Sequence, residues 1–270
     1  MLSGVPQGSV LGPVLFVCYI NDMPATVLSF IYMYADDTKI GREVGTEEDR
    51  KILQADLNRV EQWSDEWQLK FNSKKCKVLH LGHDNNKATY SMKNDGVEVP
   101  LEHSTEEKDL GVWKDDKLKF AGHVGQVVAK GSQLLGLIKR SFVHRDMDVI
   151  KKLYTALVQP HLEYANVVWH PRYKKEIKQL ERVQRATKLV GSLQSLPYES
   201  RLRQMELPSL VYRRYHGNMI EVFKYLHGMY SVTSNELLPT SALRGHDHKL
   251  LKRHCRSHAR SSFFSSDLME

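Results

Sequence analysis

The chain has 270 residues, 41% apolar and 26% charged, which is typical of a globular protein with a substantial core. Its net charge of +7 favours a polyanionic partner such as nucleic acid. There is no apolar run of about 18 residues and no basic leader, and the three scattered cysteines do not suggest a disulfide framework. An intracellular protein, nuclear or cytoplasmic, with free thiols is therefore predicted.

Turn-forming residues open the chain and lead into an apolar helix. Ser9 is predicted to cap this helix, because a short hydroxyl side chain accepts from free amides at a helix start. Pro6, Gln7 and Gly8 form a loop before it, whose amides would suit a nucleotide or its sugar. An ordinary strand-to-helix loop is the alternative. One face of the helix is apolar at helical spacing: Val10, Leu11, Val14, Leu15, Cys18 and Tyr19.

The segment from Phe30 to Ile40 predicts a hairpin of two short strands. Its flanks are rich in aromatic and β-branched residues, and Asp36 and Asp37 lie between them. Adjacent carboxylates repel each other, and a bound divalent cation offsets that repulsion. Mg²⁺ prefers such oxygen ligands. A turn with two solvated aspartates is the alternative.

Three segments together carry a family resemblance. The sequences GVPQGSVLGPVLF over 4–16, YIND over 19–22 and YADDT over 34–38 closely resemble the reverse transcriptases of non-LTR (LINE-type, jockey-like) retrotransposons. The resemblance implies an α+β fold, with a partial polymerase palm of antiparallel sheet and helices followed by an all-α thumb-like region. It also implies Mg²⁺ or Mn²⁺ as cofactor, deoxynucleoside triphosphates as substrates, and an RNA template with a DNA primer as partners.

By position in these motifs, the resemblance assigns roles to residues of this chain. Pro6, Gln7 and Gly8 would bind the incoming nucleotide, with Gln7 as the direct contact. Tyr34 and Ala35 would line the nucleotide and the primer terminus. Asp36 would be the main metal ligand of the hairpin, with Asp37 beside it.

A long helix is predicted after the hairpin. Thr46 with Asp49 three residues later resembles a capping box. The apolar positions that follow predict packing against the sheet, with base stacking by the tryptophans less favoured: Ile52, Leu53, Leu57, Val60, Trp63 and Trp67. An alternating strand is predicted over 76–81.

Two further segments resemble motifs of the same family. Lys75, three residues after Asn72, fits a lysine implicated in protonating the pyrophosphate leaving group, although a solvated lysine is an equal alternative. Leu110 and Gly111 belong to a stretch resembling the primer-grip hairpin, and His123 fits a histidine that follows it. Asp109 stands where the family usually has an aromatic residue.

The second half of the chain is predicted to be helical, with helices over roughly 121–141, 146–158, 174–191 and 208–227. Residues 151–230 carry 14 Lys and Arg against six Glu, so the positive charge is concentrated here. In 174–191, an apolar stripe of Ile177, Leu180, Val183, Thr187 and Val190 opposes a basic face of Lys174, Lys178, Arg182 and Arg185. Such a face would suit a nucleic-acid backbone, and an ordinary surface helix is the alternative.

The predicted organisation has three parts: a palm over 1–120, a thumb-like region over 121–234 and a basic, loosely ordered tail over 235–270. The tail contains His246, His248, His254, Cys255 and His258, but their irregular spacing disfavours a zinc site.

The upstream palm motif with the first catalytic aspartate, and the fingers, are not found in this sequence. Because two-metal phosphoryl transfer needs more carboxylates than Asp36 and Asp37, the chain is predicted to be deficient or inactive as a polymerase unless another chain supplies the missing palm and fingers. Two functions are compatible with the sequence. One is a truncated RNA-directed DNA polymerase, and the other is a non-catalytic nucleic-acid-binding remnant.

Overall fold

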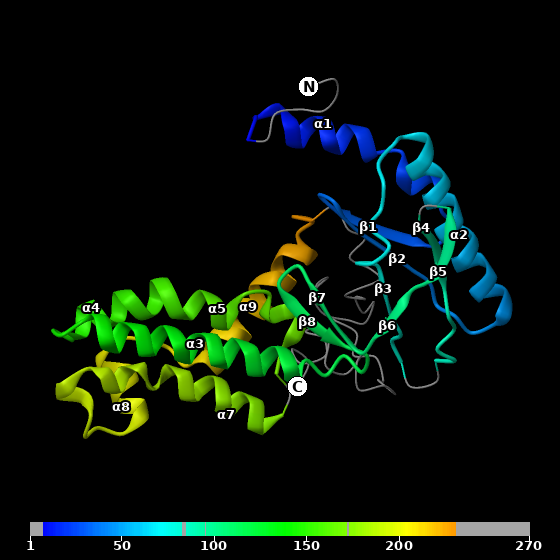
Figure 1. Cartoon of the computed structure of the whole chain (residues 1–270). Helices are drawn as coiled ribbons and strands as arrows, with labels where there is room; N and C mark the ends of the chain where they lie inside the picture. Colours follow the sequence, from blue (N-terminus) through cyan, green and yellow to red (C-terminus); the bar gives the residue numbers. More distant parts are fainter. Residues whose placement is uncertain (1–7, 83–84, 95, 172, 231–270) are drawn as a thin grey trace. The chain divides into compact units, whose positions relative to one another are not determined.

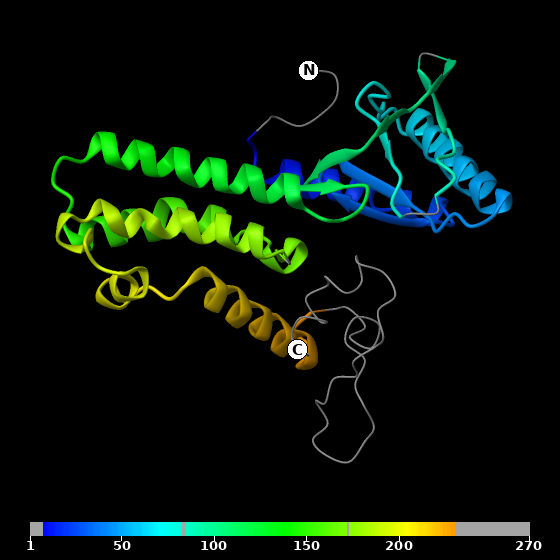
Figure 2. The ribbon, with the colours of Figure 1, turned by 90° about the horizontal axis from the view of Figure 1, so that it is seen from below.

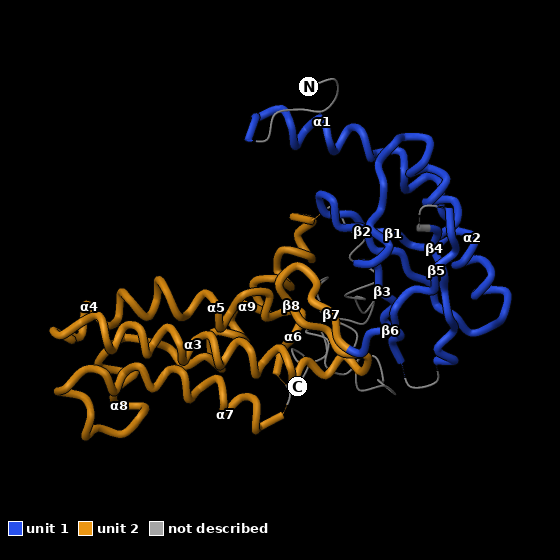
Figure 3. The backbone as a smooth tube through the Cα atoms, viewed as in Figure 1, with its two compact units in different colours: residues 1–105 blue, residues 106–270 orange. Residues whose placement is uncertain are grey.

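The structure is a computed structural model that describes residues 8–230 except 83–84, 95 and 172 (Figure 1). The chain has a mixed α+β fold, as predicted, and divides into two compact units, Met1–Thr105 and Glu106–Glu270 (Figure 3). The boundary after Thr105 lies just before the hairpin over 106–115, which the sequence analysis assigned to the palm. The functional division into palm, thumb and tail stays a prediction, and the tail lies outside the described residues.

Unit 1 combines two α-helices with short strand pairs among its described residues. The strands β1 and β2 pair antiparallel, as do β4 and β5, whereas β3 and β6 pair in parallel. The bounds are α1 Leu11–Ile20, η1 Met23–Thr26, β1 Phe30–Tyr34, β2 Asp37–Gly41, α2 Glu47–Glu66, β3 Lys77–Leu79, β4 Ser91–Asn94, β5 Val97–Pro100 and β6 Glu102–Ser104. The strand predicted over 76–81 is therefore present in shortened form as β3.

The helix α2 begins at the predicted capping box. The Asp49 amide donates to Thr46 Oγ1 at 3.2 Å, and the Thr46 amide donates to Asp49 Oδ2 at 3.0 Å. Val60 and Trp63 are buried in a small core with residues of α1, η1 and the hairpin, as predicted. Trp67, at the end of the helix, is 40% exposed and meets the ring of Tyr19 edge-on, so it is not the buried core residue that the sequence analysis predicted.

The helix α1 has the predicted position but exposes most of its apolar side chains. Ser9 Oγ accepts from the Gly12 amide at 3.0 Å, one residue before the N-cap position at Val10. Ile20 is buried and Phe16 is partly buried, whereas Val10 is 90% exposed. A helix that is apolar on all sides normally lies inside a protein. The exposed face of α1 therefore lacks a covering surface within the described residues.

Unit 2 is a helical bundle preceded by one hairpin. Its bounds are β7 Glu106–Asp109, β8 Val112–Asp115, α3 Ala121–Ser141, α4 Met147–Leu153, η2 Tyr154–Val158, α5 Gln159–Glu163, α6 Asn166–Trp169, α7 Lys174–Val183, η3 Gln184–Leu189, η4 Gly191–Leu193, α8 Tyr198–Gln204 and α9 Leu210–Leu226. The helices predicted over 121–141 and 208–227 match α3 and α9 closely. The one predicted over 146–158 continues from α4 as a π-helix, and the one over 174–191 changes to a 3₁₀-helix after Val183.

One large core holds unit 2 together. The long helices α3 and α7 run side by side (Figures 1 and 2). Their facing side chains, with those of α5, α6 and the π-helix, are fully buried, including Val124, Val158, Leu162, Trp169 and Leu180. The predicted apolar stripe of α7 and η3 lies on this core, with Leu180, Val183, Thr187 and Val190 buried.

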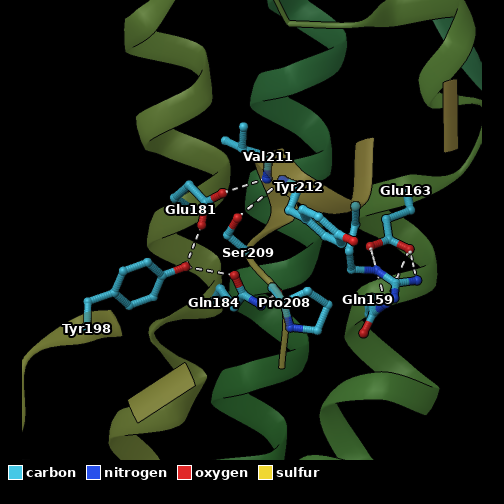
Figure 4. A network of polar contacts seen from close by, with 10 residues as sticks. Gln159, Glu163, Glu181, Gln184, Tyr198, Pro208, Ser209, Val211 and Tyr212 are labelled. Atoms are coloured by element: carbon cyan, nitrogen blue, oxygen red, sulfur yellow. Dashed lines mark hydrogen bonds and ion pairs between the residues drawn. The ribbon is translucent and has the colours of Figure 1, made fainter. Parts of the chain in front are cut away.

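A polar network fixes the start of α9 against α7 and α5 (Figure 4). Glu181 accepts from the Val211 amide at 2.9 Å, and Gln184 donates to the Pro208 carbonyl at 2.8 Å. The Tyr198 hydroxyl donates to this same pair of side chains. Burial and the neighbouring Glu181 raise the pKa of Tyr198, so the hydroxyl stays protonated as a donor.

Local signals define both ends of α9. Ser209 Oγ accepts from the Tyr212 amide at 3.2 Å, which caps the first turn. At the other end Gly228 has a positive φ of 64°, and the amides of Gly228 and Met229 donate back to the carbonyls of Tyr225 and Lys224. This pattern is a Schellman motif, in which glycine favours the left-handed residue.

Candidate functional site

The Asp-Asp pair lies at the tip of the β1–β2 hairpin. Tyr34 pairs with Asp37, so Ala35 and Asp36 form a two-residue loop. Ala35 has a positive φ of 51°, a strained conformation for a residue other than glycine that is common at functional turns. The predicted strands are confirmed, and both aspartates are exposed. No described hydrogen bond or ion pair engages either carboxylate.

Alternation along β1 gives the hairpin two different faces. Ile31 and Met33 pack against the small core that contains Trp63. Phe30, Tyr32 and Tyr34 point the other way and are more than half exposed. The hairpin therefore has one anchored face and one aromatic face open to a ligand or to another polypeptide segment.

A buried carboxylate anchors the start of the hairpin. Asp56 on α2 is fully buried and accepts from the amides of Leu28 at 3.0 Å and Ser29 at 2.8 Å, just before β1. Arg59 pairs with the same carboxylate. Burial by itself raises the pKa of Asp56, but the hydrogen bonds from Ser29, Leu28 and Arg59 outweigh it, so the net pKa is lowered and the group stays ionised.

The hairpin carboxylates fit part of a metal site. Two adjacent, exposed carboxylates provide the oxygen ligands that Mg²⁺ and Mn²⁺ prefer. Within the described parts of the chain, no three His, Cys, Asp or Glu side chains gather closely enough to hold an ion. Asp22 accepts from Trp63 Nε1 at 3.0 Å and so has a structural partner. A complete two-metal centre would need further ligands beyond Asp36 and Asp37.

The other predicted nucleotide contacts are only partly described. Pro6 and Gln7 lie outside the described residues, whereas Gly8 is exposed in a turn with a positive φ of 82°. Lys75 is exposed in the turn before β3, where its amide donates to the Asn72 carbonyl at 2.9 Å. No described interaction joins Lys75 to the β1–β2 hairpin, so its role stays a prediction.

Leu110 and Gly111 form the two-residue tip of the β7–β8 hairpin. Asp109 pairs with Val112, and both tip residues have positive φ, at 44° and 86°. The Tyr164 hydroxyl donates to the Leu110 carbonyl at 3.0 Å, and a Cβ on Gly111 would lie 3.2 Å from the Tyr164 ring. Glycine therefore suits this position both for its dihedral and for the close approach.

The sequence analysis missed how this hairpin is held. Val112 is buried in the large core of unit 2, and Asp109 forms an ion pair with Lys114. His123 is buried, accepts through Nδ1 from the Trp113 amide at 3.3 Å and meets the Trp169 ring edge-on. Burial lowers the pKa of His123, which favours the neutral ring. The histidine that the family motif highlighted thus secures the hairpin to the helical core.

The basic face of α7 is present as predicted from its sequence. Lys174, Lys178, Arg182 and Arg185 are exposed, while the opposite face of the helix is buried. The sequence analysis did not include the exposed Lys175 and Lys188, which lie on α7 and η3. No described ion pair neutralises any of these six cations. At about 1.5 Å per helical residue, the row from 174 to 188 extends over roughly 20 Å.

Comparisons with known proteins show what part of the chain is similar to. Residues 2–124 match the family described as reverse transcriptase (RNA-dependent DNA polymerase). The match covers the Asp-Asp hairpin, the Lys75 turn and the β7–β8 hairpin, and it ends in the first turn of α3.

The reverse transcriptase relatives come from mobile elements. The chain is 29% identical over 224 residues to the RNA-directed DNA polymerase from mobile element jockey of Drosophila funebris, covering 76% of this chain and 23% of the relative. It is 26% identical over 220 residues to the jockey polymerase of Drosophila melanogaster, covering 76% and 23%. It is also 27% identical over 201 residues to a probable polymerase from the Drosophila melanogaster transposon X-element, covering 67% and 21%.

The predicted resemblance to jockey-like reverse transcriptases is therefore confirmed. The chain spans between a fifth and a quarter of the length of these curated relatives. No solved structure matches the chain. As for membranes, the described residues include no helix with the length and apolar character to span one.

Proposed function

We propose that this chain is part of the palm and thumb of an RNA-directed DNA polymerase of a retrotransposon. The observation that carries the proposal is the β1–β2 hairpin, which exposes Asp36 in its two-residue loop and Asp37 at the start of β2, within the segment that matches reverse transcriptases. The reaction would join a primer 3′-hydroxyl to the α-phosphate of a deoxynucleoside triphosphate, with RNA as template.

In this proposal the described residues bind and orient the reactants. Asp36 and Asp37 would hold Mg²⁺ or Mn²⁺, which when bound neutralises charge on phosphoryl oxygens. Tyr34 and Ala35 would border the nucleotide, and Gly8 would place the loop of Pro6 and Gln7. Lys75 would donate a proton to the departing pyrophosphate.

Positioning of the primer is proposed for the β7–β8 hairpin. Leu110 and Gly111 project from strands anchored by Val112 and His123, so the tip has a rigid base. The basic face of α7 would hold the nucleic-acid backbone, because exposed cations without ion pairs lose little on binding phosphate.

The 270-residue chain is expected to be deficient when alone. Its hairpin supplies two carboxylates, and α1 exposes apolar side chains that a folded polymerase would cover. Both features support a partner polypeptide that provides further palm and fingers. The basic face favours a second function, nucleic-acid binding without catalysis.

Primer extension on poly(rA)/oligo(dT) with Mg²⁺ or Mn²⁺ tests the proposal. The chain should not extend the primer alone, and should do so when mixed with the upstream palm and fingers of a jockey-like polymerase. The paired change Asp36→Asn and Asp37→Asn should abolish that extension and leave duplex binding intact. Extension that survives the paired change would refute the assignment of the metal ligands.

The binding function has its own test. Changing Lys174, Lys178, Arg182 and Arg185 together to Gln should weaken duplex affinity by about tenfold or more and flatten its salt dependence. A matched control changes four exposed cations on other elements, Lys51, Lys70, Lys93 and Lys139, to Gln. Equal loss in both variants would show that net charge alone, and not the α7 face, accounts for binding.

A further inference from the structure

Tyr164 lies between the helical core of unit 2 and the tip of the β7–β8 hairpin. It is the residue directly after α5, and Ala165 then turns the chain into α6 with a positive φ of 52°. The Tyr164 amide donates to the Pro160 carbonyl at 3.0 Å, and the Tyr164 carbonyl accepts from Trp169 Nε1 at 2.7 Å. Because Trp169 is fully buried, these two bonds give the backbone of Tyr164 a fixed place on the core.

The side chain of Tyr164 reaches the tip of the hairpin. Its hydroxyl donates to the Leu110 carbonyl at 3.0 Å. Its ring lies so close to Gly111 that a Cβ added there would be 3.2 Å away. Leu110 and Gly111 are the two loop residues between β7 and β8. One side chain from the helical part of unit 2 therefore contacts both residues of the tip.

The base of the hairpin is attached to the same buried ring. The Trp169 ring meets the ring of His123 edge-on, and His123 Nδ1 accepts from the Trp113 amide on β8 at 3.3 Å. The tip is therefore connected to Trp169 through Tyr164, and the base is connected to it through His123. A hairpin held at both ends has a defined orientation on the core, whereas a hairpin held only at its base can swing about that attachment.

The tip contains a strained residue whose side chain stays accessible. Leu110 has a positive φ of 44°, at a position where a two-residue turn normally favours Asn or Gly. Such strain persists where the surroundings hold it, and it is common at functional sites. Here the Tyr164 hydroxyl holds the Leu110 carbonyl, while the Leu110 residue is 45% exposed and Tyr164 is 57% exposed. The tip thus presents a leucine and an aromatic ring that the core holds in place.

We propose that Tyr164 is a positioning residue, which acts through Leu110 and Gly111 to fix where the 3′-terminal nucleotide of a DNA primer lies. This inference rests on the primer-positioning function proposed above for the β7–β8 hairpin. It adds that the helical core, and not the hairpin alone, decides the position of the primer terminus. The exposed Leu110 side chain and Tyr164 ring suit the faces of a sugar and a base, because aromatic rings stack on bases of any sequence.

A positioning role differs from general support of the fold in what it changes. Removing the Tyr164 hydroxyl should move the primer terminus without weakening the binding of the duplex, because duplex affinity is proposed to come from the basic face of α7. A general loss of stability would instead weaken contacts with the terminus and with the duplex alike. The position of the terminus and the affinity for the duplex must therefore be measured separately.

Photo-cross-linking of the full 270-residue chain to a hybrid of RNA template and DNA primer tests the proposal. One hybrid carries 5-iododeoxyuridine at the primer 3′ terminus, and a second hybrid carries it further back in the duplex. The terminal probe should cross-link to the wild-type chain within residues 109–112 or at Tyr164, as mapped by mass spectrometry. With saturating hybrid, the ratio of terminal to internal cross-linking reports the position of the primer and not its affinity.

The variant Tyr164→Phe keeps the ring and removes only the hydroxyl. We expect the ratio of terminal to internal cross-linking to fall about fivefold, as for the loss of one hydrogen bond, with an unchanged dissociation constant for the duplex. The control Tyr212→Phe removes the hydroxyl of another exposed tyrosine, on α9, and should leave the ratio unchanged. Tyr164→Ala also removes the ring and should lower the ratio further. If Tyr164→Ala does not fold, Tyr164→Phe decides the test.

Three results would overturn the proposal. The first is a terminal probe that cross-links to the wild-type chain elsewhere or not at all. The second is an unchanged ratio in Tyr164→Phe. The third is an equal fall of both yields together with thermal stability, which would give Tyr164 a purely structural role. Failure of the polymerase function would be seen separately, as a lack of primer extension with added upstream palm and fingers, because cross-linking needs no catalysis.

Discussion

The β1–β2 hairpin and the helical bundle of unit 2 rest on different amounts of core. Behind the hairpin lie four buried apolar residues, Ile20, Met23, Val60 and Trp63. Unit 2 has a larger core, to which β8 and the helices from α3 to α9 contribute. The element with the carboxylates proposed to bind metal is therefore the less buried of the two. This difference agrees with the proposed roles, because a binding residue must stay accessible while a scaffold holds it in place.

The two units also use polar side chains differently. In unit 1 a single buried carboxylate, Asp56, holds the segment before the hairpin. In unit 2 several hydrogen-bonded side chains together position α9, including Glu181, Gln184 and Tyr198 (Figure 4). Removing the Asp56 carboxylate should therefore lower the free energy of unfolding more than removing one side chain of the Glu181, Gln184 and Tyr198 network.

The largest expected effect is on the core of unit 2. Trp169→Ala removes a side chain that is 0% exposed, its hydrogen bond to the Tyr164 carbonyl at 2.7 Å and its contact with His123. We expect a loss of about 3–5 kcal/mol in the free energy of unfolding. Hydrogen exchange should show lost protection in α3 and α7 with α2 unchanged. The half-exposed Val168→Ala is the control, and equal losses in α2 would mean that the units unfold together.

The next effect tests the single anchor of the hairpin. Asp56→Ala leaves the amides of Leu28 and Ser29 without their acceptor, so we expect a cost of about 2–4 kcal/mol. Urea unfolding followed by tryptophan fluorescence measures it, because Trp63 is on the same helix. Asp65→Ala, at an exposed position of α2, should change stability by less than about 0.5 kcal/mol. A similar cost for both variants would contradict the anchoring role.

Acid should weaken unit 2 through His170. Burial, with a smaller contribution from Arg214, lowers the pKa of His170 from 6.5 to about 4. The folded state therefore favours the neutral ring, and this stability is present above pH 6.5 and is lost as the pH falls toward 4. Between pH 7 and pH 4 we expect this group to contribute about 3 kcal/mol of pH-dependent stability. Thermal unfolding measured from pH 7 to pH 4 should show a smaller loss of stability for His170→Gln than for the wild-type chain.

The smallest effect concerns the tip of the β7–β8 hairpin. Tyr164→Phe removes the hydroxyl that donates to the Leu110 carbonyl at 3.0 Å but keeps the ring beside Gly111. We expect a loss of about 1 kcal/mol and faster exchange of the Gly111 amide. Tyr173→Phe, at another exposed tyrosine, is the matched control. An unchanged exchange rate in Tyr164→Phe would show that β7–β8 is held by Val112 and His123 alone.

Much of the local structure follows from the sequence alone. The capping box at Thr46, the strands on either side of Asp36 and the extents of α3 and α9 depend on neighbours a few residues apart. Side-chain spacing and capping chemistry act over such distances, so they can be read from the chain. The family resemblance likewise rests on short motifs with fixed residues and spacing.

Tertiary structure decided what lies inside and what lies outside. Periodicity marked the apolar face of α1 but could not show that its side chains stay exposed, because burial depends on segments far away in sequence. The same holds for Tyr164 reaching Leu110, for His123 securing β8 and for the burial of Arg214 and Asn218 on α9. These contacts join residues that only the folded chain brings together, and their free energies depend on distance and desolvation in three dimensions.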